Sequence, residues 1–356
     1  MPHLPQPGVS IHKKSKTFKG FTLYSPIRGT HAYLLNMAGD VVHRWALYEG
    51  GINHAMLLDN GNLFISEFGG GVLPVVIARG GRLREYDWDG NLVWEHVDIY
   101  QHHDARRLAN GNTAYIAWQT IPKKVHPRVK GGIKGSTAED GHIYGDVIRE
   151  VNQAGEVVWE WRCWEHMQVE KYPIMALYPR EEFGHANTLV PLANGDYMIG
   201  FRVINTILIV DRKTKKIKWE MRDDSWGGQH DPHILPNKNI LLFANGQMTS
   251  LPHPFSRILE INPRTCKTVW EYRDKRVLNF WSPFISGADR LPNGNTLICE
   301  GGYGRFFEIT REGETVWEYN NPYITPSPLY GNKQNWVFRA HRYAASSPQI
   351  RRRVKQ

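Results

Sequence analysis

The stretch INHAMLLDNGNLFIS, residues 52–66, is the first of five similar segments that recur along the chain. Each has a short apolar run, a polar turn containing Asn, and a second apolar run. In four of the five the turn is Asn-Gly, a strong hairpin signal because this turn needs positive φ at both central residues. The remaining segments are HHDARRLANGNTAYIA (102–117), HANTLVPLANGDYMIGF (185–201), HDPHILPNKNILLFA (230–244) and SGADRLPNGNTLICE (286–300).

Each hairpin is followed by two more predicted strands, and the last of them carries a tryptophan. A unit of four short strands repeating at this period is typical of the blades of a β-propeller. Large aromatic residues at a fixed place in each blade are expected to pack one blade on the next. The six tryptophans, at intervals of 47 to 65 residues, are Trp45, Trp94, Trp159, Trp219, Trp270 and Trp317.

The count of strands predicts how the ring closes. Five complete units cover 50–97, 101–162, 184–221, 229–273 and 283–319, and only three strands remain near the N-terminus. The C-terminal NWVFRAHRY (335–343) supplies the missing innermost strand, which removes the open sheet edge. We therefore predict an all-β, six-bladed β-propeller that forms one domain over residues 18–345. The basic ends, 1–17 and 346–356, are predicted to be flexible tails.

Bulk composition narrows the function classes. The net charge is +9 and the pI about 9.3, which favours anionic partners. The basic residues form no stripe outside the two ends, so a small anionic or aromatic substrate is expected rather than nucleic acid. No apolar run approaches the length of a membrane span, and no membrane partner is expected. We expect a monomer or a homodimer.

The cysteines and the first residues bear on the compartment. The chain has three cysteines, Cys163, Cys266 and Cys299, with no CxxC pair, so a disulfide framework is not predicted. The opening MPHLPQPGVSIHKKSK lacks the apolar core of a secretory signal. Together these features favour a reduced, cytoplasmic protein.

Histidines recur at the start of the innermost strands. Aligning the segments on the hairpin Asn places His103-Asp104 and His230-Asp231 at the same blade position. His54 and Asn187 occupy neighbouring aligned positions, and His185 lies two residues before Asn187, so both should point the same way. We expect these side chains to face one another across the central channel. The Asp of each pair is expected to serve an adjacent blade.

Two more side chains extend this constellation. Arg202 ends a second strand at a place where the other blades carry small or apolar residues. A guanidinium group binds the oxygens of sulfate, phosphate or carboxylate in pairs. His341 lies on the closing strand. Histidine changes charge near neutral pH, and its imidazole can attack an electrophile.

Two segments, 118–145 and 163–183, are too long to be simple turns. Loops of this length are usually functional or disordered. Both flank the second and third blades on one side, so we expect them to cover one mouth of the channel as a lid.

With these histidines and Arg202, the chain resembles the bacterial arylsulfate sulfotransferase family. The resemblance covers about residues 30–345 and is carried by segment 159–221 with its HAN…FR pairing, HHDARRLANGN, HDPHILPNKN and WVFRAHRY. Members are six-bladed propellers that move a sulfuryl group from an aryl sulfate to a phenol through a sulfo-histidine. The resemblance implies that His230 is the nucleophile, with His103, His185 and Arg202 holding sulfuryl oxygens or acting as acid and base.

The same reading assigns five residues to substrate binding: His54, Asn187, Asp104, Asp231 and His341. It needs no metal, no cofactor and no nucleotide sulfate donor (PAPS). A sulfuryl group in transfer carries charge on three oxygens, and an arginine with several imidazoles supplies the donors for that charge.

Other readings remain open on the residues alone. The channel histidines, with His102 and His233 added, also suit a metal-dependent propeller lyase or hydrolase that acts on an anionic substrate. A quinone-dependent dehydrogenase shares similar Trp-bearing strands, but this chain has no adjacent cysteine pair. A scaffold that only binds partners would leave the histidines and Arg202 unexplained.

Overall fold

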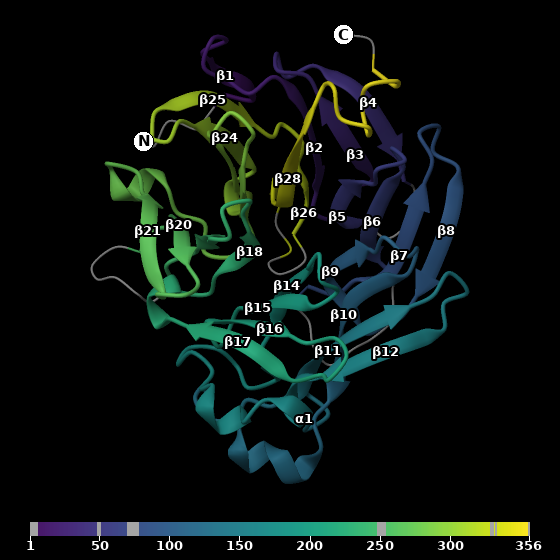
Figure 1. Ribbon diagram of the computed structural model, residues 1–356, viewed down its shortest axis with the longest axis vertical. Coiled ribbons are helices and arrows are strands. Elements are labelled where there is room, and N and C mark those ends of the chain that lie inside the picture. The colour runs from purple at the N-terminus through teal and green to yellow at the C-terminus, as the bar shows by residue number, and fades with distance from the viewer. Residues whose placement is uncertain are drawn as a thin grey trace.

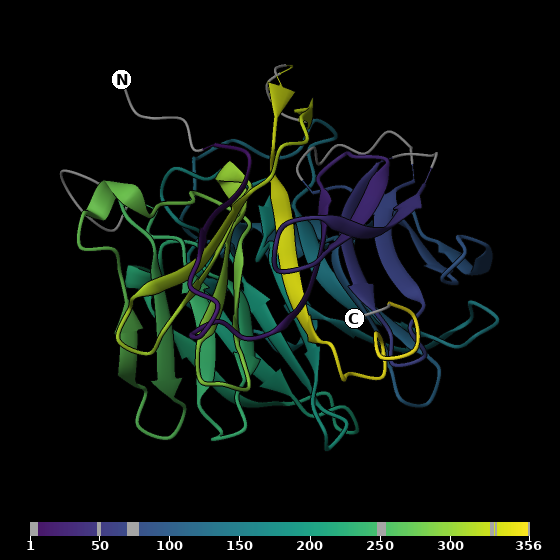
Figure 2. The same cartoon turned by 90° about the horizontal axis from the view of Figure 1, so that it is seen from above.

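The computed structural model describes residues 6–47, 51–69, 78–247, 254–327, 331 and 333–354. Six antiparallel four-stranded cores are arranged around a central axis, as Figures 1 and 2 show. The all-β, six-bladed fold predicted from the repeats is therefore confirmed.

The first three blades follow the predicted boundaries closely. Blade one contains β5 (Ile52–Leu57), β6 (Leu63–Phe68), β7 (Gly81–Tyr86) and β8 (Leu92–Val97). Blade two contains β9 (Gln101–Arg107), β10 (Thr113–Thr120), β11 (Tyr144–Val151) and β12 (Val157–Arg162), with the short β13 (Glu182–Phe183) parallel to β11. Blade three contains β14 (Ala186–Pro191), β15 (Tyr197–Phe201), β16 (Thr206–Val210) and β17 (Ile217–Arg222).

The other three blades complete the ring. Blade four contains β18 (His230–Ile234), β19 (Ile240–Ala244), β20 (Arg257–Asn262) and β21 (Lys267–Tyr272). Blade five contains β22 (Gly287–Arg290), β23 (Thr296–Glu300), β24 (Arg305–Ile309) and β25 (Thr315–Asn320). Blade six runs outward from β28 (Val337–Ala344) through β2 (Gly20–Pro26) and β3 (His31–Leu35) to β4 (Val41–Ala46).

The connections carry short elements. The small hairpin of β26 (Thr325–Pro326) and β27 (Lys333–Gln334) precedes β28. The helical turns are α1 (Cys163–His166), η1 (Lys123–Arg128), η2 (Val169–Lys171), η3 (Asp224–Trp226), η4 (Val277–Asn279) and η5 (Gly301–Tyr303). Among the described residues, no helix combines the length and the apolar character needed to cross a membrane.

The closing strand lies where the sequence predicts it. β28 pairs antiparallel with β2, with Gly20 opposite Ala344 and Leu23 opposite His341. Blade six is thus built from both ends of the chain. Figure 1 shows the yellow β28 beside the purple β2 on the inner side of the ring.

The ends of the chain differ from the predicted tails. Within 1–17, β1 (Gly8–His12) pairs with β25 and adds a fifth, outermost strand to blade five. Within 346–356, Ile350 is only 1% exposed and packs in the core cluster that contains Phe21. The sequence did not predict these contacts, because a short edge strand and a single buried isoleucine add little apolar pattern to a segment rich in basic residues.

The repeated tryptophan has the inter-blade role predicted for it. Each indole N–H donates to a backbone carbonyl in the turn between the third and fourth strands of the next blade, at 2.9–3.0 Å. The bond from Trp317 joins blade five to blade six and therefore contributes to the closure of the ring. The pairs are Trp45–Asp87, Trp94–Gln153, Trp159–Arg212, Trp219–Pro263, Trp270–Arg311 and Trp317–Met37.

A second inter-blade contact, here called the glutamate latch, repeats in four blades. A glutamate of the third strand accepts a hydrogen bond from the Asn that ends the hairpin turn of its own blade. It accepts another hydrogen bond from an arginine of the next blade. In blade one, Asn62 and Arg107 both lie 2.8 Å from Glu85. The other latches are Asn112–Glu150–Arg212, Asn239–Glu260–Arg290 and Asn295–Glu308–Arg342.

The channel has two mouths, which we name by the backbone that surrounds them. The innermost strands begin at the loop mouth, where the long connections gather, and end at the hairpin mouth, where the Asn turns lie. Segments 118–145 and 163–183 both leave from the loop mouth. They pack on each other, with Gly132 N donating to Ile174 O at 3.0 Å, and form the lobe around α1 in Figure 1. Most of their length lies beside blades two and three rather than over the channel.

Candidate active site

The innermost strands are irregular where the predicted site residues lie. β9, β14 and β18 each lose register with their neighbours, next to His103, at Asn187 and next to His230 respectively. His103, His185 and Asp231 have positive φ angles of 50°, 53° and 57°. Non-glycine residues in this region cost about 1–3 kcal/mol each and concentrate at functional sites. The expectation that pleat alternation orients these side chains is therefore wrong, because bulges and left-handed residues set their directions.

His103 and His185 are brought together at the loop mouth. Their ring centroids lie 4.5 Å apart in an edge-to-face arrangement, and both side chains are buried. His103 Nδ1 also lies 2.7 Å from Nδ1 of His102, so one of these nitrogens donates to the other. Burial holds the pKa of His103 well below its ordinary value, and the neighbouring His185, His102, His230 and Arg202 lower it further.

A carboxylate orients His185. Its Nδ1 lies 2.5 Å from Oε1 of Glu182, whose other oxygen accepts the indole N–H of Trp118 at 2.9 Å. Burial alone would raise the pKa of Glu182, but the charge of His185 and its hydrogen bond leave it lower than usual. Because an ionised carboxylate only accepts, Nδ1 of His185 is the donor and Nε2 is free to exchange a proton.

The surroundings of His230 fix its tautomer. Nδ1 faces two acceptors, Oδ1 of Asn245 at 2.7 Å and the carbonyl of Gly228 at 3.1 Å. The Asn245 amide cannot be reversed without loss, because its Nδ2 donates to the carbonyls of Ser282 and Ile285 at 2.8 and 3.0 Å. Nδ1 of His230 therefore carries the proton, and Nε2 carries a lone pair.

His230 is also kept neutral. Burial holds its pKa well below the ordinary value, and the positive charge of Arg202 lowers it further, while the bond to Asn245 opposes the shift. A neutral imidazole with an available Nε2 is a nucleophile.

Arg202 is a buried cation without a carboxylate partner among the described residues. Its Nη2 donates to the hydroxyl of Tyr178 at 2.6 Å. Its Nε has no hydrogen-bond partner among the described residues. Tyr178 in turn donates to Oε1 of Gln247. Buried charges are usually paired, so this guanidinium, which acts on the pKa of His103 and of His230, has donors available for an anion.

The comparisons with known proteins can now be set against this geometry. The family model described as arylsulfotransferase (ASST) matches residues 13–326. The chain belongs to the arylsulfotransferase family. Membership of this family supports a sulfuryl-transfer function and implies a transferase enzyme. Among curated proteins, no sequence matches.

Among solved structures, one with a TM-score above 0.5 supports the fold of this arylsulfotransferase family member and nothing further. A protein of unknown function from Bacteroides caccae shares 14% identity over 90% of this chain and 98% of its own, with a TM-score of 0.57. A streptogramin B lyase has 10% identity, coverage of 96% and 95%, and a TM-score of 0.49. Virginiamycin B lyase from Staphylococcus aureus, with quinupristin, has 9% identity, coverage of 88% of each chain, and a TM-score of 0.48.

Deeper in the arylsulfotransferase channel, Arg339 of β28 joins three other blades. Its Nη1 lies 3.0 Å from Asp104, its Nε 3.0 Å from Asp231, and its Nη2 donates to Thr188 Oγ1 at 2.8 Å. Burial opposes ionisation of Asp104, but Arg106 and Arg339 hold its pKa below the usual range. For Asp231 burial prevails over Arg339, and the pKa is raised. Arg339 thus reaches both aspartates across the channel from blade six. Each aspartate also contacts an adjacent blade, since Asp104 accepts the backbone N–H of Leu189 at 3.0 Å and Asp231 accepts that of Ala288 at 3.3 Å.

The remaining residues predicted to bind substrate are His54, His341 and Asn187, and each contacts other protein groups. His54 Nε2 lies 2.9 Å from Nε2 of His341, and its Nδ1 lies 3.5 Å from Asp104, so both histidines belong to the deeper network. Burial lowers the pKa of His54 to about 3. Asn187 donates to the backbone carbonyl of Gln229, the residue before His230, at 2.7 Å. Their roles in substrate binding stay predictions.

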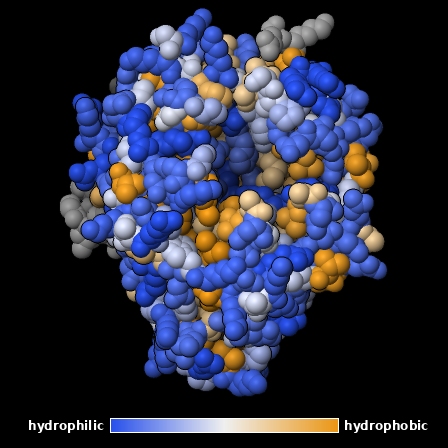
Figure 3. Space-filling model, viewed as in Figure 1, coloured by the Kyte–Doolittle hydropathy of each residue, from blue (hydrophilic) through white to orange (hydrophobic). Residues whose placement is uncertain are grey.

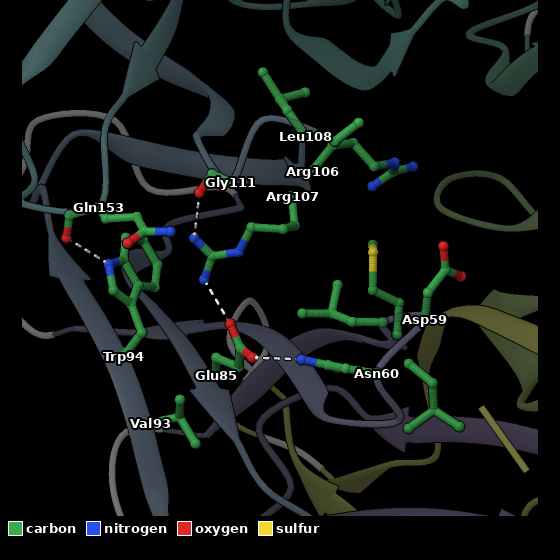
Figure 4. Close-up of a pocket in the computed structure, with 14 residues that line it drawn as sticks. Asp59, Asn60, Glu85, Val93, Trp94, Arg106, Arg107, Leu108, Gly111 and Gln153 are labelled. Atoms are coloured by element: carbon green, nitrogen blue, oxygen red, sulfur yellow. Dashed lines mark hydrogen bonds and ion pairs between the residues drawn. The ribbon is translucent and has the colours of Figure 1, made fainter. Parts of the chain in front are cut away.

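A pocket of about 710 Å³ lies elsewhere, between blades one and two at the rim of the hairpin mouth. Figure 4 shows its polar wall, where Arg107 bonds to Glu85 and Asn60 approaches the same carboxylate. A similar pocket of about 620 Å³ between blades four and five is lined by the equivalent Glu260 and Arg290. Because both contain a glutamate latch, we interpret them as gaps left by blade packing.

Sequence reasoning missed four residues that complete the two networks. Glu182 and Tyr178 lie within the long 163–183 segment, Asn245 follows the second strand of blade four, and Arg339 lies within the quoted WVFRAHRY. Only Arg339 carried a usable signal, since a charged residue in an innermost closing strand must find buried partners.

Proposed function

We propose that the chain moves a sulfuryl group from an aryl sulfate to a phenolic acceptor through a sulfo-histidine at His230, without PAPS. The observation that carries the proposal is the fixed tautomer of His230, whose Nδ1 bonds to Asn245 and leaves Nε2 as the nucleophile. Arg202, buried and without a carboxylate partner among the described residues, supports an anionic sulfuryl group beside it.

In the first half-reaction, Nε2 of His230 attacks the sulfur, and the bond from sulfur to the aryl oxygen breaks. The departing phenolate takes a proton from Nε2 of His185, and Glu182 stabilises the imidazolium from which it comes. The guanidinium of Arg202 and the imidazole of His103 donate to the sulfuryl oxygens as charge builds on them. The products are a free phenol, neutral His185 and sulfo-His230.

The second half-reaction reverses the roles with a different phenol. Neutral His185 takes the acceptor's hydroxyl proton, the acceptor oxygen attacks the sulfur, and the bond from sulfur to Nε2 breaks. His230 returns to its neutral form and His185 keeps the proton for the next cycle. Losing one preorganised donor such as Arg202 should slow transfer by about 10²–10³-fold.

The experiment is incubation of the full chain with 4-nitrophenyl sulfate and a panel of phenols. Wild type should release nitrophenol and, without acceptor, show an adduct of about 80 Da, the mass of SO3, by intact-mass measurement. His230→Ala should lose both the release and the adduct. The matched control is His233→Ala, which removes the other imidazole of the same HDPH strand and should retain both.

Two outcomes would refute the proposal. One is that folded wild type gives neither adduct nor nitrophenol with any phenol. The other is a stoichiometric metal that is lost when His103 or His230 is replaced, which would favour the metal-dependent lyase or hydrolase instead.

A further inference from the structure

A second group of potential ligands lies in the channel on the side of the hairpin mouth, away from the loop mouth where His103 and His185 lie. One atom from each of Asp231, His233 and Asp289 lies within 4.8 Å of the other two. These residues come from the innermost strands of blades four and five. The two carboxylates repel each other at this separation, and the guanidinium of Arg339, 3.0 Å from Asp231, opposes that repulsion.

Hydrogen bonds show which imidazole nitrogen of His233 is available. Nδ1 lies 3.0 Å from the backbone carbonyl of Asp231, which can only accept. Nδ1 therefore carries the proton, and Nε2 carries the lone pair. Metal-binding histidines usually have this arrangement, with one ring nitrogen donating to a carbonyl or carboxylate while the other faces the ion.

A fourth nitrogen faces this group. Nε2 of His341 lies 2.9 Å from Nε2 of His54, so one of these two nitrogens donates to the other. Nδ1 of His341 lies 3.6 Å from Oδ2 of Asp289. When Nε2 of His341 is the donor, its Nδ1 carries a lone pair that an ion beside Asp289 can use.

Solvent can reach this group. The side chains of Asp289 and His341 are 37% and 21% exposed, whereas Asp231 is largely buried. Figure 3, which views the hairpin-mouth face, shows a hydrophilic hollow near the centre of the ring. An ion therefore has a route to the group from the face opposite the proposed sulfuryl-transfer site.

We propose that Asp231, His233 and Asp289, with His341 as a fourth ligand, bind one divalent transition-metal ion, with Zn²⁺ preferred. Mixed imidazole and carboxylate ligands suit Zn²⁺ and its neighbours better than Mg²⁺ or Ca²⁺. Bonds of about 2.1 Å place tetrahedral ligand atoms about 3.4 Å apart, so modest side-chain rotation closes the group around the ion. Because His341 lies on β28, the ion links the closing strand to blades four and five.

The test is isothermal titration of Zn²⁺ into chelator-treated full-length protein. Wild type should bind one ion per chain at this site, and His233→Ala and Asp289→Asn should each weaken binding by at least about 10-fold. Both variants should melt like wild type in chelator, which shows that they fold. Anomalous scattering from zinc-soaked crystals should place the ion between Asp231, His233 and Asp289.

His230→Ala separates this proposal from the sulfuryl-transfer proposal, because it should lose the covalent adduct while retaining zinc binding. Zinc binding that disappears in His230→Ala or His103→Ala but persists in His233→Ala would assign the ion to the loop mouth and overturn the proposal. Folded wild type that binds no zinc would also overturn it, and a proton on His341 would then balance Asp289.

Discussion

At the scale of single residues, the central feature of the candidate site is a buried, neutral imidazole next to a guanidinium that has no carboxylate partner in the described part of the chain. Burial and Arg202 both disfavour protonation of His230, and Asn245 opposes them while fixing the tautomer. The same positive charge that lowers the pKa of His230 stabilises an incoming sulfuryl group. Nucleophile activation and anion binding thus depend on one side chain.

This coupling predicts the pH dependence of adduct formation. The reaction needs neutral His230, and its pKa is lowered from 6.5, so the rate should stay level as the pH falls past 6.5 and decline only at lower pH. Arg202→Gln removes a positive neighbour and should move this acid limb to higher pH, besides slowing the reaction. The measurement is the pH profile of the nitrophenol burst, with the exposed Arg222→Gln as control. An acid limb at or above pH 6.5 in wild type would contradict the prediction.

At the scale of strands and turns, the sequence predicted what repeats and missed what does not. The Asn turns placed five blades, because each of these units needs the same hairpin. Trp45 and the strands left over at the two ends placed the sixth blade, since every blade makes the same tryptophan contact with its neighbour. The left-handed conformation of His103 and His185 was not predicted, because positive φ is uncommon for any non-glycine residue. Glu182 and Asn245 lie in segments that differ between blades, so no alignment of repeats could locate them.

The inter-blade tryptophans predict a graded effect on stability. Trp317 is fully buried, and its N–H joins blade five to Met37 of blade six, with Arg342 stacked 4.6 Å from its ring. Trp317→Phe should lower the free energy of unfolding by about 2–4 kcal/mol, through a cavity and an unpaired carbonyl. Trp94→Phe, at a more exposed equivalent position, should cost less. Urea unfolding of both variants tests the order, and equal or reversed losses would contradict it.

At the scale of the whole molecule, one strand both closes the ring and carries the charge at its centre. β28 supplies the innermost strand of blade six, and its Arg339 reaches Asp104 of blade two and Asp231 of blade four. These aspartates lie next to His103 and His230 in the chain. Ring closure and the placement of the candidate nucleophile are therefore physically connected.

Arg339 provides the sharpest test of that connection. Replacing it with Ala leaves two buried carboxylates without this cation, and loss of one partner from a buried ion pair costs about 3–5 kcal/mol. Arg339→Ala should therefore fold with a clearly lower urea midpoint, and Arg339→Lys should fall between it and wild type, because a single ammonium cannot span both aspartates. The exposed Arg351→Ala should be neutral.

Removal of residues 337–356 should prevent folding to a soluble monomer, because blade six then exposes the edge of β2 to the channel. A truncated protein that melts like wild type would show that the five complete blades and β2–β4 need no closing strand, and an unchanged midpoint in Arg339→Ala would show that Asp104 and Asp231 do not depend on Arg339.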